Sequence, residues 1–113
     1  MPSIKLSKIK GNPLDFQSIE TSNFTAESTK MYMVNALSTT IVITLPVLAE
    51  GDTLVFHSLN TSTQNVQIDN TGVEVVGVGG TIAAGDNLEL TAGQSVQLVA
   101  VSPTVLTLVG GVV

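Results

Sequence analysis

The chain has 113 residues, of which 43% are apolar and only 12% are charged, and its formal net charge is −5. This length suits one domain with one hydrophobic core, and no apolar run reaches the roughly 18 residues that a membrane helix needs. The absence of cysteine excludes disulfides and thiolate metal sites. Residues 31–113 carry acidic side chains and no lysine, and such a body repels phosphate backbones, so we expect no nucleic-acid partner. The lack of a long apolar run predicts no membrane partner.

The surface of this chain is sparsely charged for a small domain, in which roughly 25% of residues are usually charged. We therefore expect other subunits to cover part of the surface. The alternative is that the plentiful Ser, Thr, Asn and Gln side chains keep a monomer soluble. The composition is compatible with either a monomer or an oligomer, and it favours the oligomer.

Residues 1–30 differ from the rest of the chain because they hold all four lysines. The first ten residues carry a charge of +3 and alternate lysines with apolar side chains: Ile4, Lys5, Leu6, Lys8, Ile9 and Lys10. Gly11-Asn12-Pro13 then interrupts any regular element, and a polar run follows. We predict an extended arm over residues 1–30, with one short strand at 3–9. Its lysines either contact an acidic partner surface or simply keep an exposed segment soluble.

One short pattern occurs three times, at residues 49–56, 84–90 and 92–98. Each copy has a small residue, a glycine, a polar residue and then apolar side chains two residues apart. Glycine permits the positive φ of a tight turn, and a spacing of two places the apolar side chains on one face of a strand. Phe56, Leu90 and Leu98 occupy the same place in the three copies.

From Lys30 onward the apolar spacing is typical of strands separated by turns. The expected strands are residues 30–37, 40–45, 53–59, 66–69, 73–78, 87–90, 95–102 and 104–109. The sequence therefore predicts an all-β body over residues 31–113. Its architecture is expected to be an antiparallel β-sandwich or barrel, jelly-roll-like, of about eight strands.

Several expected strands are apolar on both faces: Ile41-Val42-Ile43, residues 73–78 and residues 96–101. Two apolar faces need a second covering layer, for which a neighbouring subunit is one source. The C-terminal residues 108–113 are also apolar and uncharged. We expect Val109, Val112 and Val113 to lie in a subunit interface.

No motif in the sequence indicates catalysis. His57 is the only histidine, it lies within an expected strand, and no serine stands in a nucleophile elbow. Asp52 and Asp86 follow turn glycines, a position where aspartate contributes to Ca²⁺ sites but more often bonds its own backbone. Arginine is absent, so the usual phosphate clamp is missing. We expect no enzyme, cofactor or metal.

More than one pair of acidic residues could be proposed as the two catalytic carboxylates of a glycosidase. Glu50 with Asp52 and Glu74 with Glu89 are two such pairs, but any two acidic residues would serve equally well. Neither pair predicts a glycosidase.

The order of elements from residue 34 to 110 resembles the small β modules of tailed-bacteriophage virion proteins. The resemblance lies in a β-run ending at Leu45-Pro46, then Gly51-Asp52 and a strand, then Val66-Gln67-Ile68-Asp69, a glycine break and residues 91–98. Such modules often have a Gly-x-x-Trp turn before the last strand, where this chain has Ser102-Pro103-Thr104-Val105.

By this resemblance we expect a capsid decoration (cement) protein, which is made in the host cytoplasm and forms a homotrimer on the virion surface. The major capsid protein, or another virion protein, would be the partner of the N-terminal arm. A tail-fibre, collar or baseplate adaptor is the first alternative. A small carbohydrate-binding module is the second.

Overall fold

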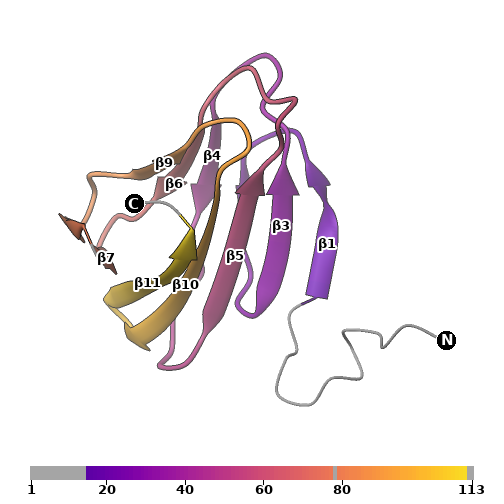
Figure 1. Cartoon of the computed structure of the whole chain (residues 1–113). Coiled ribbons are helices and arrows are strands. Elements are labelled where there is room, and N and C mark those ends of the chain that lie inside the picture. Colours follow the sequence, from indigo (N-terminus) through magenta and orange to yellow (C-terminus); the bar gives the residue numbers. More distant parts are fainter. Residues whose placement is uncertain (1–14, 78, 112–113) are drawn as a thin grey trace, which may run out of the picture.

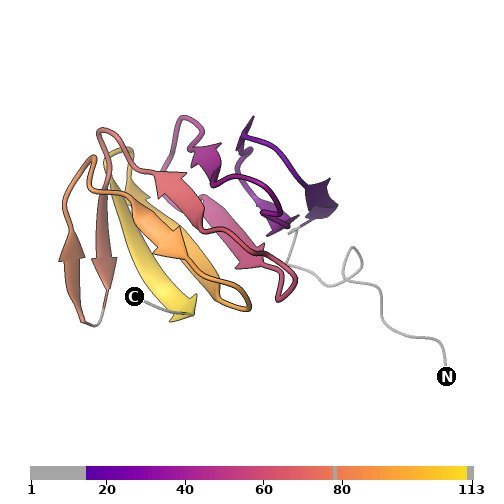
Figure 2. The same cartoon turned by 90° about the horizontal axis from the view of Figure 1, so that it is seen from above.

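The computed structural model describes residues 15–77 and 79–111, with side chains from Ile19 onward. These residues form strands and turns and no helix, which confirms the all-β prediction. Within them no helix is long and apolar enough to cross a bilayer. The strands form two sheets that pack face to face (Figures 1 and 2).

The larger sheet has seven strands. In spatial order they are β1 (Asp15–Glu20), β3 (Lys30–Val34), β5 (Thr53–Ser58), β10 (Ser95–Ser102), β11 (Val105–Gly111), β7 (Glu74–Gly77) and β8 (Gly80–Ile82). The smaller sheet has four strands. They are, in order, β2 (Phe24–Thr25), β4 (Ile41–Thr44), β6 (Val66–Asp69) and β9 (Leu88–Leu90).

The first six strands alternate between the two sheets. β1, β3 and β5 pair in parallel in the large sheet, and β2, β4 and β6 pair in parallel in the small sheet. Only the later strands add antiparallel pairs, such as β5 with β10 and β10 with β11. The predicted β-sandwich is confirmed, but the predicted antiparallel pairing was wrong, because both sheets are mixed. β3 and β4 follow one another in the chain but lie in opposite sheets, so the segment between them crosses from one sheet to the other.

The described residues contain eleven strands, more than the expected eight or so. β1 and β2 account for two of the additional strands, and both lie in the stretch that the sequence assigned to an arm. Ala26, directly after β2, is only 1% exposed. The β body thus includes residues 15–30, whereas the strand expected at residues 3–9 lies outside the described residues.

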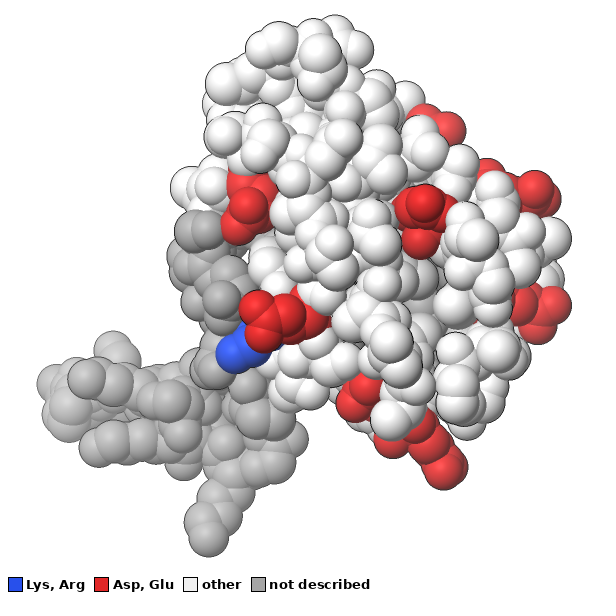
Figure 3. Space-filling model, turned by 180° about the vertical axis from the view of Figure 1, so that it is seen from behind, with Lys and Arg blue, Asp and Glu red and all other residues white. Residues whose placement is uncertain are grey.

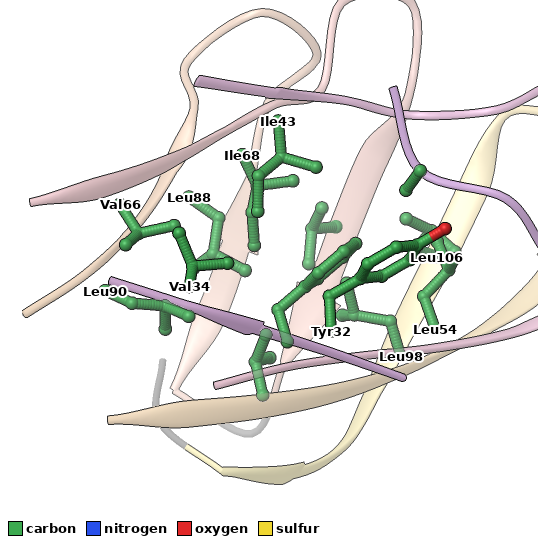
Figure 4. Packing of buried hydrophobic residues seen from close by; sticks show 14 of the residues in the cluster. Tyr32, Val34, Ile43, Leu54, Val66, Ile68, Leu88, Leu90, Leu98 and Leu106 are labelled. Atoms are coloured by element: carbon green, nitrogen blue, oxygen red, sulfur yellow. The ribbon is translucent and has the colours of Figure 1, made fainter. Parts of the chain in front are cut away.

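The hydrophobic core fills the space between the two sheets (Figure 4). Ile43 and Ile68 come from the small sheet, and Leu54 and Leu98 come from the large sheet. Tyr32 stacks against Phe56 with ring centroids 5.9 Å apart. Its hydroxyl accepts a 2.8 Å hydrogen bond from the Glu27 N–H, so this buried polar group is satisfied.

The repeated pattern forms the same turn in all three copies, as the sequence predicted. Gly51, Gly85 and Gly93 have φ angles of 90°, 88° and 83°. In each copy the N–H of the following residue donates to the carbonyl three residues earlier at 3.0 Å, which is the geometry of a type II turn. Phe56, Leu90 and Leu98, which occupy the same place in the three copies, are each 0% exposed.

Candidate interaction surface

The outward face of the large sheet is apolar at its centre. Successive side chains of a strand point to opposite faces of the sheet. The residues that precede and follow a buried residue in the same strand therefore point away from the core. The buried residues concerned are Tyr32, Leu54, Phe56 and Leu98. We call the resulting surface the large-sheet face, defined by Met31, Met33, Val55, His57, Gln97 and Val99. Strand register places Met33, His57 and Ser95 in one row, and Met31, Val55 and Gln97 in the next.

The large-sheet face carries no acidic residue or lysine at any outward position of β3, β5 or β10. Ile19 on β1 is 52% exposed and Val101 on β10 is 50% exposed, so the apolar character continues beyond the centre. Isolated exposed apolar side chains are ordinary, but a contiguous apolar sheet face is a candidate interaction surface.

The outward face of the small sheet has the opposite character, and we call it the small-sheet face. Its outward residues on β4, β6 and β9 are Val42, Thr44, Gln67, Asp69 and Glu89, four of which are polar or charged. The view from behind shows acidic side chains spread over the body rather than gathered in one cluster (Figure 3). Such a surface is suited to exposure to solvent.

Acidic residues on and near the small-sheet face are held by local hydrogen bonds. The hydroxyl and the N–H of Thr71 both donate to Asp69, at 2.6 and 3.0 Å, and these bonds hold the pKa of that carboxyl below its ordinary value. The Asn65 amide donates to Glu89 at 2.9 Å.

The histidine considered for catalysis lies on the large-sheet face. His57 is half-buried, and its register neighbours are Met33 and Ser95. No pocket exists among the described residues in which a substrate would meet it. The position is that of a strand histidine in an apolar surface.

Asp52, one of the two residues considered for Ca²⁺, is engaged in its own turn. Its carboxylate accepts hydrogen bonds from the Ala49 N–H at 2.8 Å and the Ser28 hydroxyl at 3.0 Å. Asp86 follows the second turn glycine and is exposed. Across the described part of the chain, no three His, Asp or Glu side chains gather where a metal ion would bind.

The acidic pair Glu74 and Glu89 does not face a common cleft. Glu74 lies on β7 of the large sheet, and Glu89 lies on β9 of the small sheet. The aromatic residues do not form a sugar platform either, where their side chains are described. Tyr32 is 4% exposed and Phe56 is 0% exposed, and the Phe24 ring packs at a tilt against Tyr32 with ring centroids 4.9 Å apart.

The predicted partner-contact residues lie outside the described residues: Ile4, Lys5, Leu6, Lys8, Ile9 and Lys10. Val112 and Val113, predicted for the subunit interface, also lie outside them. Val109 lies on β11 and is 54% exposed, at a bulge between the pairs Leu98–Leu108 and Gln97–Gly110. The segment up to Gly111 is an inner strand of the large sheet and not a loose tail.

The large-sheet face was not predicted from the sequence. The two apolar faces of residues 96–101 were visible in the sequence, but a single strand does not reveal which neighbours share its outer surface. The register of β3, β5 and β10 supplies that information.

No protein-family model matches the chain, and no curated protein matches it in sequence.

Proposed function

We propose that the protein is a non-enzymatic component of a bacteriophage particle, a capsid decoration protein that binds the outer head surface as a homotrimer and stabilises the shell. The observation that carries this proposal is the division of the chain into a basic N-terminal segment and an acidic β body without a pocket. Residues 15–113 hold all nine acidic residues and a single lysine. Within the described body no cavity exists for a small ligand, so binding takes place on surfaces.

The N-terminal segment is the part proposed to contact the shell. It enters the body at β1, which is the edge strand of the large sheet. Ile4, Leu6 and Ile9 would be buried against a capsid protein, and the lysines would contact acidic groups beside them. An extended segment of this kind also binds by adding a strand to a partner sheet. Bound across the junction of two capsid proteins, it would hold them together against the pressure of the packaged DNA.

Removal of residues 1–10 is expected to abolish binding to stripped heads and to leave the body folded, because all described strands begin at Asp15 or later. Co-sedimentation with heads measures the binding, and far-UV circular dichroism with a thermal melt measures the fold. Retention of binding by the truncated protein would show that another surface carries the contact. Unfolding would show that these residues belong to the core.

Two matched variants separate the contributions of charge and apolar burial to this contact. One replaces Lys5, Lys8 and Lys10 with Gln, and the other replaces Ile4, Leu6 and Ile9 with Ser. A contact dominated by charge loses affinity in the first variant and weakens as salt is added to the wild type. A contact dominated by burial loses affinity in the second.

The tail-fibre, collar or baseplate adaptor is the second candidate, because the same surfaces would serve a contact with another tail protein. A decoration protein would be abundant on the head, whereas an adaptor would be present at few copies per particle. The carbohydrate-binding alternative has less support, since Tyr32 and Phe56 are buried.

A further inference from the structure

We propose that the large-sheet face is the surface through which copies of this chain associate. This inference rests on the homo-oligomeric part of the proposed function and specifies where the subunits meet. It moves the interface from the C-terminal valines to Met31, Met33, Val55, His57, Gln97 and Val99. In a dimer two such faces would pack together, and in a trimer three would surround the axis.

The chemistry of the large-sheet face favours burial. Four of its six residues are Met or Val, and burying them removes apolar surface from water without the desolvation cost of a charge. Met31 and Met33 are unbranched and flexible, so they fill the gaps of an imperfectly matched surface. His57 and Gln97 are the two residues of this face that supply hydrogen-bonding groups. This composition resembles the core of a subunit interface, where charged residues are depleted.

The large-sheet face has the size of the centre of a subunit interface. Strands lie about 4.8 Å apart and rise about 3.3 Å per residue, so five-residue lengths of β3, β5 and β10 give a planar area of roughly 240 Å². A standard interface takes about 800 Å² from each partner, so the large-sheet face would form the middle of the contact and its surroundings would complete it.

Charge indicates why the occupant is a second copy. Residues 15–113 are strongly acidic, so two bodies repel each other wherever their carboxylates meet. The outward positions of β3, β5 and β10 carry no acidic residue, and there two bodies can approach closely. A basic partner would gain more from the small-sheet face, which carries Asp69 and Glu89.

A matched pair of substitutions tests the inference. Val55→Glu places a carboxylate at the centre of the large-sheet face, and Val42→Glu makes the same change at an outward position of the small sheet. Val55 and Val42 are both half-buried. Light scattering with size exclusion measures the mass over a range of concentrations. We expect wild type and Val42→Glu to share one oligomeric mass and Val55→Glu to elute as a single chain of 11.7 kDa.

A second pair of substitutions, with smaller changes in side-chain size, provides the same test if a Val→Glu variant does not fold. Gln97→Glu and Gln67→Glu preserve side-chain size on the large-sheet and small-sheet faces respectively. Like charges brought together in an interface are strongly unfavourable, so Gln97→Glu should raise the dissociation constant by roughly a hundredfold or more. Gln67→Glu should leave it unchanged.

Two results would overturn the inference. The first is a wild-type protein that remains a single chain at every concentration. The second is a folded Val55→Glu or Gln97→Glu variant that keeps the wild-type mass. The second result leaves the proposed function in place and moves the subunit contact elsewhere. The position of the protein on the particle tests the proposed function separately, whatever mass is found.

Discussion

Replacing Asn70 with alanine is expected to lower the free energy of unfolding by about 3 kcal/mol, because it removes three hydrogen bonds from a buried site. Asn70 is 0% exposed. Its amide donates to the carbonyls of Val73 at 2.9 Å and Ala83 at 3.1 Å, and its side-chain oxygen accepts from the Asn87 N–H at 2.8 Å. One side chain thus links the turn before β7 to the turn before β9.

Urea unfolding followed by circular dichroism measures the effect of Asn70→Ala. Asn65→Ala is the matched control, because Asn65 is exposed and its amide makes a hydrogen bond to the carboxylate of Glu89. We expect the control to lose less than about 1 kcal/mol, as exposed polar contacts usually do. Equal losses in the two variants would contradict the structural role given to Asn70.

The Phe56→Ala variant is expected to lose about 4 kcal/mol of unfolding free energy, since it leaves a large cavity between the sheets. Phe56 is 0% exposed and stacks on Tyr32, whose ring also meets that of Phe24 at an interplanar angle of 43°. Through Tyr32, the Phe56 ring is therefore linked to β2 of the small sheet.

Phe56→Leu is the control for this change because it keeps most of the apolar volume. Its expected loss is about 1.5 kcal/mol, the upper range for an apolar swap of similar size. The same urea titration compares the two variants. A Phe56→Ala loss as small as that of Phe56→Leu would mean that the site collapses around the smaller side chain and that the aromatic stack contributes little.

The all-β class and the repeated turn were predictable from local sequence. A glycine at the third position of a type II turn and apolar side chains two residues apart are short-range features. Gly51, Gly85 and Gly93 therefore occupy the predicted conformation, and Phe56, Leu90 and Leu98 lie on the buried faces of their strands.

The parallel pairing of the early strands was not predictable from the same features. A strand has the same alternation whether its neighbour runs parallel or antiparallel, and the difference depends on how the chain crosses between sheets. β3 pairs with β5, with Lys30 opposite Leu54, after the chain has passed through β4 in the other sheet. Neither Ser38 nor Thr39 indicates such a crossover.

The strands β1 and β2 were missed for a different reason. Both lie at the edge of a sheet, and β2 has only two residues. An edge strand needs a single hydrogen-bonding partner, so its sequence is under weaker apolar constraint than that of an inner strand. The segments DFQSIE and FT show no clear alternation, and the composition change near Lys30 placed the boundary too late.

The proposed function makes its most direct claim about position on the virion. Gold-labelled antibody against the protein, applied to intact particles of the phage that the proposal requires to encode it, measures that position by electron microscopy. Our account predicts dense label over the whole outer surface of the head and none on the tail. Label confined to the tail, collar or baseplate would contradict it and would favour the adaptor function.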